Sequence, residues 1–188
     1  MSLMDQNLVL TANSGSGTAY QTVTATAVSA STYDQLNGAL IPTSGGTYAT
    51  PPNSIIGNAQ FFGEDLGLGR GVGTPQLVGF TGPGTPGAAT SLTVQLQGAP
   101  DNGGGTIAGL TFVPYIQTRA IALASIIASR RLFAFDFPRR QEGDGLPRFI
   151  NLNFVVAGSN FTGLSIAAYI NLGETSAQAT LGQYPANY

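Results

Sequence analysis

The chain has 188 residues, enough for one domain with its own hydrophobic core. It contains no Cys and no His, and all seven of its cationic residues are Arg. Thiol and imidazole catalysts, a Ser-His-Asp triad, ordinary zinc sites and lysine Schiff bases are therefore excluded. We expect no enzyme, no cofactor, no metal and no small-molecule substrate.

The chain is poor in charge, with only 9% charged residues and a net charge of −2. Soluble domains usually have about 25% charged residues, so this composition favours a protein that is packed against others. The missing cationic surplus argues against a nucleic-acid partner. No secretory leader and no apolar run of bilayer length occurs, so we expect no membrane partner either.

Five segments alternate apolar and polar residues with the period of a half-buried strand. With 26 Gly and 11 Pro to form turns, they predict an all-β fold, a jelly-roll-like antiparallel β-sandwich with long loops. The five segments are residues 22–27, 92–97, 132–137, 150–156 and 164–171.

The connections between these segments are less uniform. Residues 158–163 are bounded by Gly and join two alternating runs, which predicts a hairpin. Residues 112–130 fit one helix beginning near Pro114, or short extended pieces with a turn near Ala124 and Ser125; we favour the second. Residues 37–90 are rich in Gly and Pro and are expected to be mostly loop.

The expected organisation is therefore a sandwich domain over residues 14–172 with an extended arm at each end. Residues 1–13 form the N-terminal arm and residues 173–188 the C-terminal arm. The second arm is small and polar, with Tyr184 and Tyr188 near its end.

The motifs that could carry chemistry all have simpler interpretations. The glycines of residues 67–73 lack the strand and helix of a dinucleotide site. Asn160 to Thr162 match a glycosylation acceptor but are expected to be a turn. A hydrolase using two carboxylates from Asp136, Glu142 and Asp144 remains a minor alternative, and solvated loop charge is the favoured interpretation.

The arginines are unevenly distributed. Six of the seven lie between Arg119 and Arg148, and that stretch has a net charge of +3 while the rest of the chain has −5. One interpretation is pairing with carboxylates of the same chain. The other is docking on an acidic protein surface, for which the bidentate guanidinium is well suited.

Three strings of residues carry a resemblance to a known family. They are Ser91 to Gln97 followed by Asp101, Arg130 to Phe133 followed by Pro138, and Arg148 to Gly158 with its return over residues 161–170. From about residue 65 to residue 173 the chain resembles the small jelly-roll cement, or decoration, proteins of tailed bacteriophages. Residues 36–62 look like an insertion relative to that family.

The resemblance implies a β-sandwich that binds the outer surface of an icosahedral phage head and bridges its major capsid protein subunits. It also implies self-association, commonly as a dimer, and location in the virion after synthesis in the host bacterial cytoplasm. A low charge and two arms fit such a role, because several weak contacts made together bind strongly.

We therefore predict a capsid cement protein whose contacts come from the two arms and the Arg group. The candidate contact residues are Leu3, Leu8, Arg130, Arg131, Arg139, Arg140, Tyr184 and Tyr188. The alternative is a receptor- or carbohydrate-binding module of a phage tail or baseplate, which the absence of Trp makes less favourable.

Overall fold

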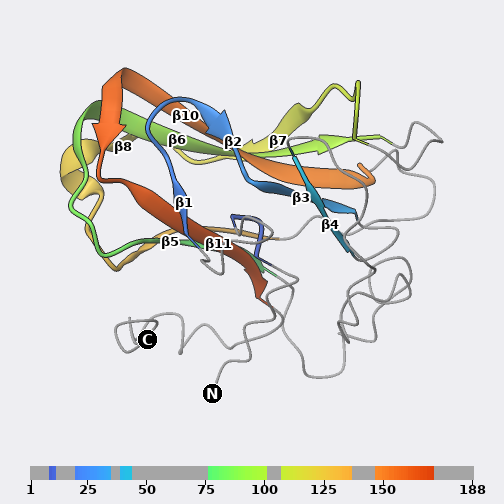
Figure 1. The fold of residues 1–188 in the computed structure, drawn as a ribbon, viewed down its shortest axis with the longest axis horizontal. Helices are drawn as coiled ribbons and strands as arrows, with labels where there is room; N and C mark the ends of the chain where they lie inside the picture. Colours follow the sequence, from blue (N-terminus) through green and yellow to red (C-terminus); the bar gives the residue numbers. More distant parts are fainter. Residues whose placement is uncertain are drawn as a thin grey trace.

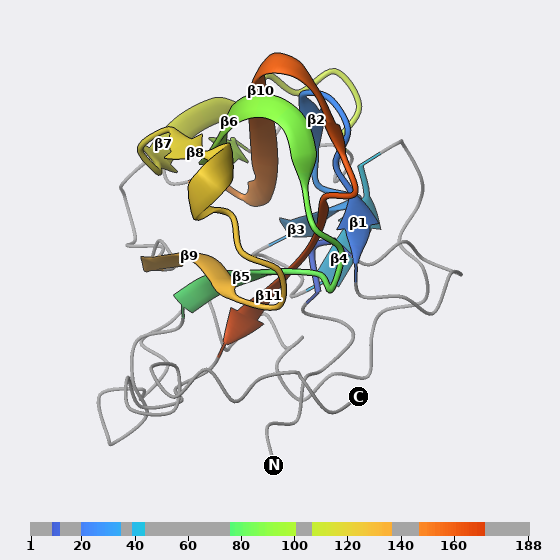
Figure 2. The same ribbon diagram turned by 90° about the vertical axis from the view of Figure 1, so that its left-hand side faces the viewer.

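The computed structural model describes residues 9–11, 20–34, 39–43, 76–100, 107–136 and 147–171. They form two antiparallel sheets that face each other, so the expected all-β sandwich is confirmed (Figures 1 and 2). The first sheet has the order β1 (Gln21–Thr22), β11 (Ser165–Asn171), β5 (Gln76–Thr81) and β9 (Arg131–Asp136). The second has the order β4 (Ala39–Pro42), β3 (Ser31–Asp34), β10 (Phe149–Thr162), β6 (Gly87–Ala99) and β7 (Val113–Gln117). In that sheet β2 (Ala27–Val28) also pairs with β10, and β8 (Ile121–Ala122) with β6.

The pairing of strands is nested along the chain. The outermost pair is β1 with β11, followed by β3 with β10 and β5 with β9, and the innermost pair is β6 with β7. A ribbon of paired strands that is folded over in this way is a jelly roll, built from two Greek keys. Strands that follow one another in the sequence therefore mostly lie in opposite sheets.

The hairpin expected across residues 158–163 is wrong. Residues 158–162 continue β10, which pairs with β6, whereas β11 pairs with β5 in the other sheet. The chain crosses between the sheets after Thr162, at the left of Figure 1. Two alternating runs can face each other across a sandwich as readily as they pair within a sheet, and the local pattern does not distinguish the two.

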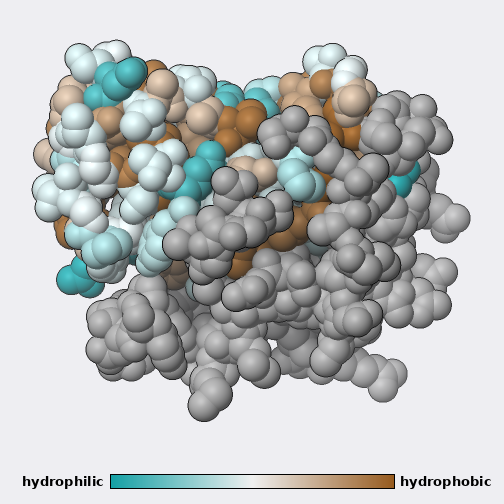
Figure 3. All heavy atoms as spheres, in the orientation of Figure 1, coloured by the Kyte–Doolittle hydropathy of each residue, from teal (hydrophilic) through white to brown (hydrophobic). Residues whose placement is uncertain are grey.

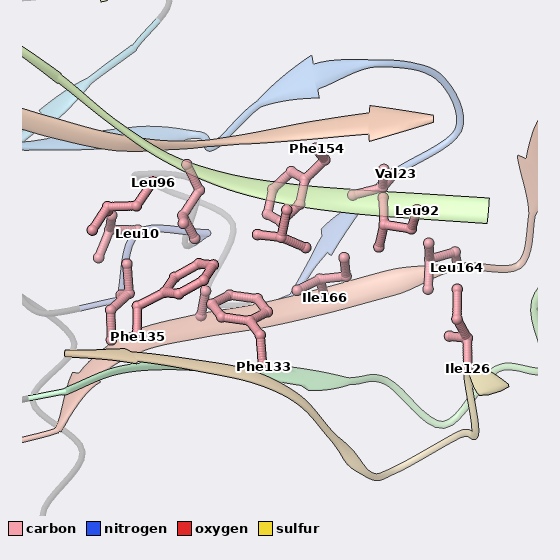
Figure 4. Packing of buried hydrophobic residues seen from close by; sticks show 14 of the residues in the cluster. Leu10, Val23, Leu92, Leu96, Ile126, Phe133, Phe135, Phe154, Leu164 and Ile166 are labelled. Atoms are coloured by element: carbon pink, nitrogen blue, oxygen red, sulfur yellow. The ribbon is translucent and has the colours of Figure 1, made fainter. Parts of the chain in front are cut away.

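The core lies between the sheets and uses the predicted alternation. Leu92, Val94 and Leu96 on β6 are at most 1% exposed, while the residues between them are partly exposed. Phe133 and Phe135 of β9 project from the first sheet toward these side chains (Figure 4). The alternating faces of residues 92–97 and 132–136 are therefore confirmed, and Phe137 lies outside the described residues.

The start of β10 is buried on both faces, not on the single face expected. Its outer face carries Phe149, which is fully buried in a second small cluster. That cluster also contains Ile41, Ala99 and Ile107, with Leu110 and Phe112 against it.

Several segments differ from the sequence-based expectation. Residues 22–27 are not one strand: bends at residues 24–26 separate β1 from β2, where the chain passes from one sheet to the other. The stretch 37–90, expected to be mostly loop, contains β4, β5 and the start of β6.

Residues 113–125 agree with the expectation. They are extended pieces followed by a 3-10 turn at Leu123–Ser125, so the favoured alternative there is confirmed.

Residues 9–11, within the expected N-terminal arm, are buried in the sandwich. Val9 forms a bridge with Tyr169 of β11, and the Leu10 N–H donates to the carbonyl of Ala168 at 2.8 Å. The Leu10 carbonyl in turn accepts from the Ser31 N–H at 2.8 Å. This short segment therefore joins the two sheets by hydrogen bonds at the side of the sandwich where β1 and β3 lie.

One glycine in the core is required by a close approach. Gly79 of β5 pairs with Phe133 of β9, and the Phe133 ring lies against the glycine backbone. A Cβ atom at residue 79 would stand 2.7 Å from Phe133 Cδ1, and closer still to two other ring atoms. The ring thus fills the space that a side chain at residue 79 would take.

Gly79→Ala is expected to lower the free energy of unfolding by about 1–3 kcal/mol, because an overpacked core must shift to accept the methyl group. The matched control is Gly87→Ala at the start of β6, where the added Cβ meets only the Thr162 hydroxyl, at 2.9 Å. Urea denaturation measures both. Equal effects of the two substitutions would show that the Phe133 ring does not depend on Gly79.

Candidate docking surface

The structure describes two of the eight predicted contact residues. Arg130 and Arg131 are both exposed. The other six lie outside the described residues: Leu3, Leu8, Arg139, Arg140, Tyr184 and Tyr188. Of the Arg group, Arg130, Arg131, Arg139 and Arg140, only the first two are described. Arg119 and Arg148, which were not predicted contacts, are described as well.

Arg148 belongs to the interior and not to a contact surface. Its Nε donates to Asp34 Oδ1 at 3.0 Å and its Nη2 donates to Asp34 Oδ2 at 2.9 Å. The two side chains are 9% and 0% exposed, and the guanidinium lies 4.8 Å from the centre of the Phe149 ring. For this arginine the interpretation as an internal ion pair is confirmed.

The ion pair joins two strands of the second sheet. Register places Asp34 of β3 opposite Phe149, the residue after Arg148. Sequence reasoning missed Asp34 because β3 is short and polar, and nothing local marks its residues as buried. Burial and, secondarily, the charge of Asp34 raise the pKa of the neighbouring Tyr33 phenol well above its usual value.

The remaining described arginines lie on one side of the sandwich, which we call the flank and define as residues 113–131. It runs from β7, the last strand of the second sheet, to the start of β9, the last strand of the first. Figure 2 shows β7 and β9 on the same side, one above the other. The flank is thus opposite the side that residues 9–11 join.

The flank carries exposed apolar side chains. Four of the five large hydrophobic residues exposed in the described part of the chain belong to it: Val113, Tyr115, Ile116 and Ile127. Ile127 is the most exposed, at 60%. Figure 3 shows the opposite side of the sandwich, on which polar and apolar side chains are mixed.

Local hydrogen bonds hold the C-terminal end of the flank. The buried Thr81 hydroxyl accepts from the Arg130 N–H at 3.0 Å and donates to the Ile127 carbonyl. The Thr81 N–H donates to the Arg130 carbonyl at 2.9 Å. The two exposed side chains, Ile127 and Arg130, therefore project from a fixed backbone.

A β-bulge directs Arg131 outward. The register shifts between Gly79 and Phe80, so that Gly79 pairs with Phe133 and Phe80 pairs with Arg131. Without the shift, Arg131 would share the inward face with Phe133, because residues two apart on a strand point the same way. The bulge instead places it opposite Phe80, on the outer face of the first sheet.

The flank has a net charge of +3, from Arg119, Arg130 and Arg131, with no carboxylate among its own residues. All three arginines are exposed, and none is in an ion pair with another described residue. Exposed arginines beside aromatic and aliphatic side chains are the composition of protein interfaces. The flank therefore has a composition complementary to an acidic, partly apolar protein surface.

The described residues contain no cluster of side chains that could hold a metal ion. Asp136, a member of the minor hydrolase alternative, is exposed and accepts a hydrogen bond from Gln76 Nε2 at 3.1 Å. Its proposed partners Glu142 and Asp144 lie outside the described residues.

No protein-family model matches the chain, and no curated protein is significantly similar to it. Among the described residues no helix is long and apolar enough to span a bilayer.

Arg148→Leu is expected to lower the free energy of unfolding by about 3–5 kcal/mol, because it leaves the Asp34 carboxylate buried without its guanidinium. Arg131→Leu, at an exposed site, is the control and is expected to change stability by about 0.5 kcal/mol or less. Replacing both Asp34 and Arg148 by Leu should recover most of the loss. Denaturant unfolding measures all three, and a single Arg148 variant as stable as the control would contradict the role of the ion pair.

Stability is expected to fall as the pH rises above about 10, because Tyr33 ionises in the unfolded chain near that pH and stays neutral when buried. The unfolded state then binds fewer protons than the folded one, which favours unfolding. Tyr33→Phe should reduce this slope. The measurement is unfolding free energy against pH for this variant and for the unchanged protein, and equal slopes for the two would disprove the assignment.

Proposed function

We propose that this protein is a capsid cement protein, which binds the outer surface of an icosahedral phage head and bridges its major capsid protein subunits. The observation that supports this most directly is the flank, with three exposed arginines among exposed apolar side chains on a jelly roll. We take the major capsid protein as the partner because residues 65–173 resemble the cement family.

The distribution of charge supports docking through the flank. The chain has only 9% charged residues, yet three arginines lie on one side of the fold. None of the three is in an ion pair with another described residue. Arginine forms bidentate bonds with carboxylates and loses less hydration than lysine, so it suits a contact that excludes water. An acidic patch on the capsid protein is the complementary surface.

Bridging requires more than one contact per molecule. The flank supplies one, and we assign the others to the arms, residues 1–8 and 173–188, with Leu3, Leu8, Tyr184 and Tyr188 as their anchors. Self-association as a dimer would double every contact. Linked weak contacts then act together, since binding of one raises the effective concentration of the next.

Purified protein is expected to co-sediment with phage heads that lack it, at a fixed and saturable ratio to the major capsid protein. Electron microscopy of the pellet would then show its positions on the shell. Failure to bind intact heads would reject the cement role and favour the tail or baseplate alternative, for which glycan binding is the direct assay.

The double variant Arg130→Gln and Arg131→Gln should bind heads about tenfold more weakly, the loss of roughly 1.4 kcal/mol of interface energy. The matched control adds the same charge change on the opposite side, with Thr22→Glu and Thr24→Glu at two exposed residues. Equal weakening by the two pairs would mean that net charge, and not the flank, determines binding.

A further inference from the structure

A row of amide side chains crosses the outer face of the second sheet and ends at its edge. Asn153 Nδ2 on β10 donates to Gln95 Oε1 on β6 at 2.9 Å. Gln95 Nε2 donates in turn to Gln117 Oε1 on β7 at 3.0 Å. Register places Gln95 opposite both other residues, so the three amides lie side by side across the strands.

The hydrogen bonds of the row all run in one direction, from β10 to β7, and its last member lies at the edge of the sheet. Gln95 accepts through its oxygen and donates onward through its nitrogen, so the row begins at Asn153 and ends at Gln117, whose remaining side-chain group is Nε2. That group has two donors and no acceptor among the described residues. The next strand along the sheet would therefore need an acceptor opposite Gln117.

The backbone of β7 is also open at this point. The Thr118 N–H donates to the Val94 carbonyl at 2.9 Å, and the Val94 N–H donates to the Thr118 hydroxyl at 3.0 Å, so the amide of residue 118 points toward β6. Because these directions alternate along an antiparallel strand, the N–H and carbonyl of Gln117 point away from β6. No described strand pairs with that edge, and all five residues of β7 are exposed.

The charge and the residue types near the outer edge of β7 restrict which strand can pair with it. Arg119 lies two residues beyond Gln117 and is exposed, with no carboxylate near it in the flank. Pro114 has no N–H and limits pairing along the first half of β7. The part of β7 that is open to a further strand is therefore its C-terminal end, around Gln117, next to the amide donor and the Arg119 cation.

We propose that β7 is a strand-addition site for an extended acidic segment of a partner protein, with a carboxylate of that segment opposite Gln117 and near Arg119. The added strand continues the second sheet through backbone hydrogen bonds, and the carboxylate continues the amide row as its final acceptor. That the segment belongs to the capsid protein rests on the proposed function; the strand-addition site itself does not.

A second copy of the chain is a poorer occupant than an acidic segment. It would bring another β7, with the same terminal amide donors and the same Arg119, against side chains that are themselves donors and a cation. A carboxylate supplies both the acceptor and the opposite charge, and such charge-assisted bonds are stronger than neutral ones.

The first test uses the full-length protein and two short synthetic peptides, one of alternating valine and glutamate and one of alternating valine and lysine. Backbone amide shifts in nuclear magnetic resonance spectra should change at β7 with the glutamate peptide and remain unchanged with the lysine peptide. No change at β7, or the same change with both peptides, would overturn the proposal. Shifts at β7 that depend on protein concentration without peptide would identify a second copy as the occupant and also overturn it.

Gln117→Glu reverses the charge preference without touching the core. This variant should lose at least about tenfold in affinity for the glutamate peptide and gain binding of the lysine peptide. Gln76→Glu on β5 is the matched control, because Gln76 donates only to Asp136 and lies in the other sheet. A Gln117 variant that keeps the original preference would show that the amide row does not select the partner.

Hydrogen exchange on heads separates this inference from the proposed function. Protein bound to heads should show slowed exchange of the Gln117 amide, whereas the free protein should exchange it rapidly. Binding to heads without protection at β7 would overturn strand addition on the shell and leave the cement role intact. If heads do not bind but the glutamate peptide does, the cement role fails and the strand-addition site stands.

Discussion

The long antiparallel pairing of β6 with β10 is the constraint on which the rest of the structure depends. It joins segments about sixty residues apart and runs from the Ala99–Phe149 pair to the Gly87–Thr162 pair. Its inner face supplies Leu92 and Phe154 to the core, and its outer face supplies the first two members of the amide row. Where the ribbon must bend over the end of the sandwich, Gly158 takes a φ of 81°, which favours glycine.

The two sides of the sandwich differ in how the sheets are connected. On one side, residues 9–11 donate to β11 and accept from β3, so hydrogen bonds pass from sheet to sheet. On the other, the described chain crosses between the sheets only at residues 123–130, and no described strand pairs with the outer edge of β7. Edge strands with apolar residues are usually protected, because they pair readily with other chains. An unprotected edge beside three arginines is consistent with a surface kept for a partner.

Buried and exposed arginines serve different purposes here. Arg148 is held by Asp34 and stacks on Phe149, so its charge is neutralised inside the fold. Arg119, Arg130 and Arg131 are exposed, and the bulge opposite Gly79 and Phe80 turns Arg131 outward. The described arginines, which lie close together in the sequence, therefore divide into one in the interior, Arg148, and three on the surface. Whether an arginine is buried depends on whether a carboxylate lies beside it, because a buried guanidinium is stable only in such a pair.

The sequence by itself determined the fold class and most of the inward-facing residues, and its lack of Cys, His and Lys excludes thiol, imidazole and lysine chemistry. Alternation placed Leu92, Val94, Leu96, Phe133 and Phe135 on the buried face, because a strand turns each successive side chain to the opposite side. It could not reveal β3 or β5: the first is polar, and the second is buried on both faces and contains Gly79, so neither alternates. Only the tertiary structure decided that β10 and β11 lie in different sheets, that Asp34 meets Arg148, and that Gln117 ends a row of amides at an open edge. These are contacts between residues far apart in the chain, and local periodicity carries no information about which faces come together.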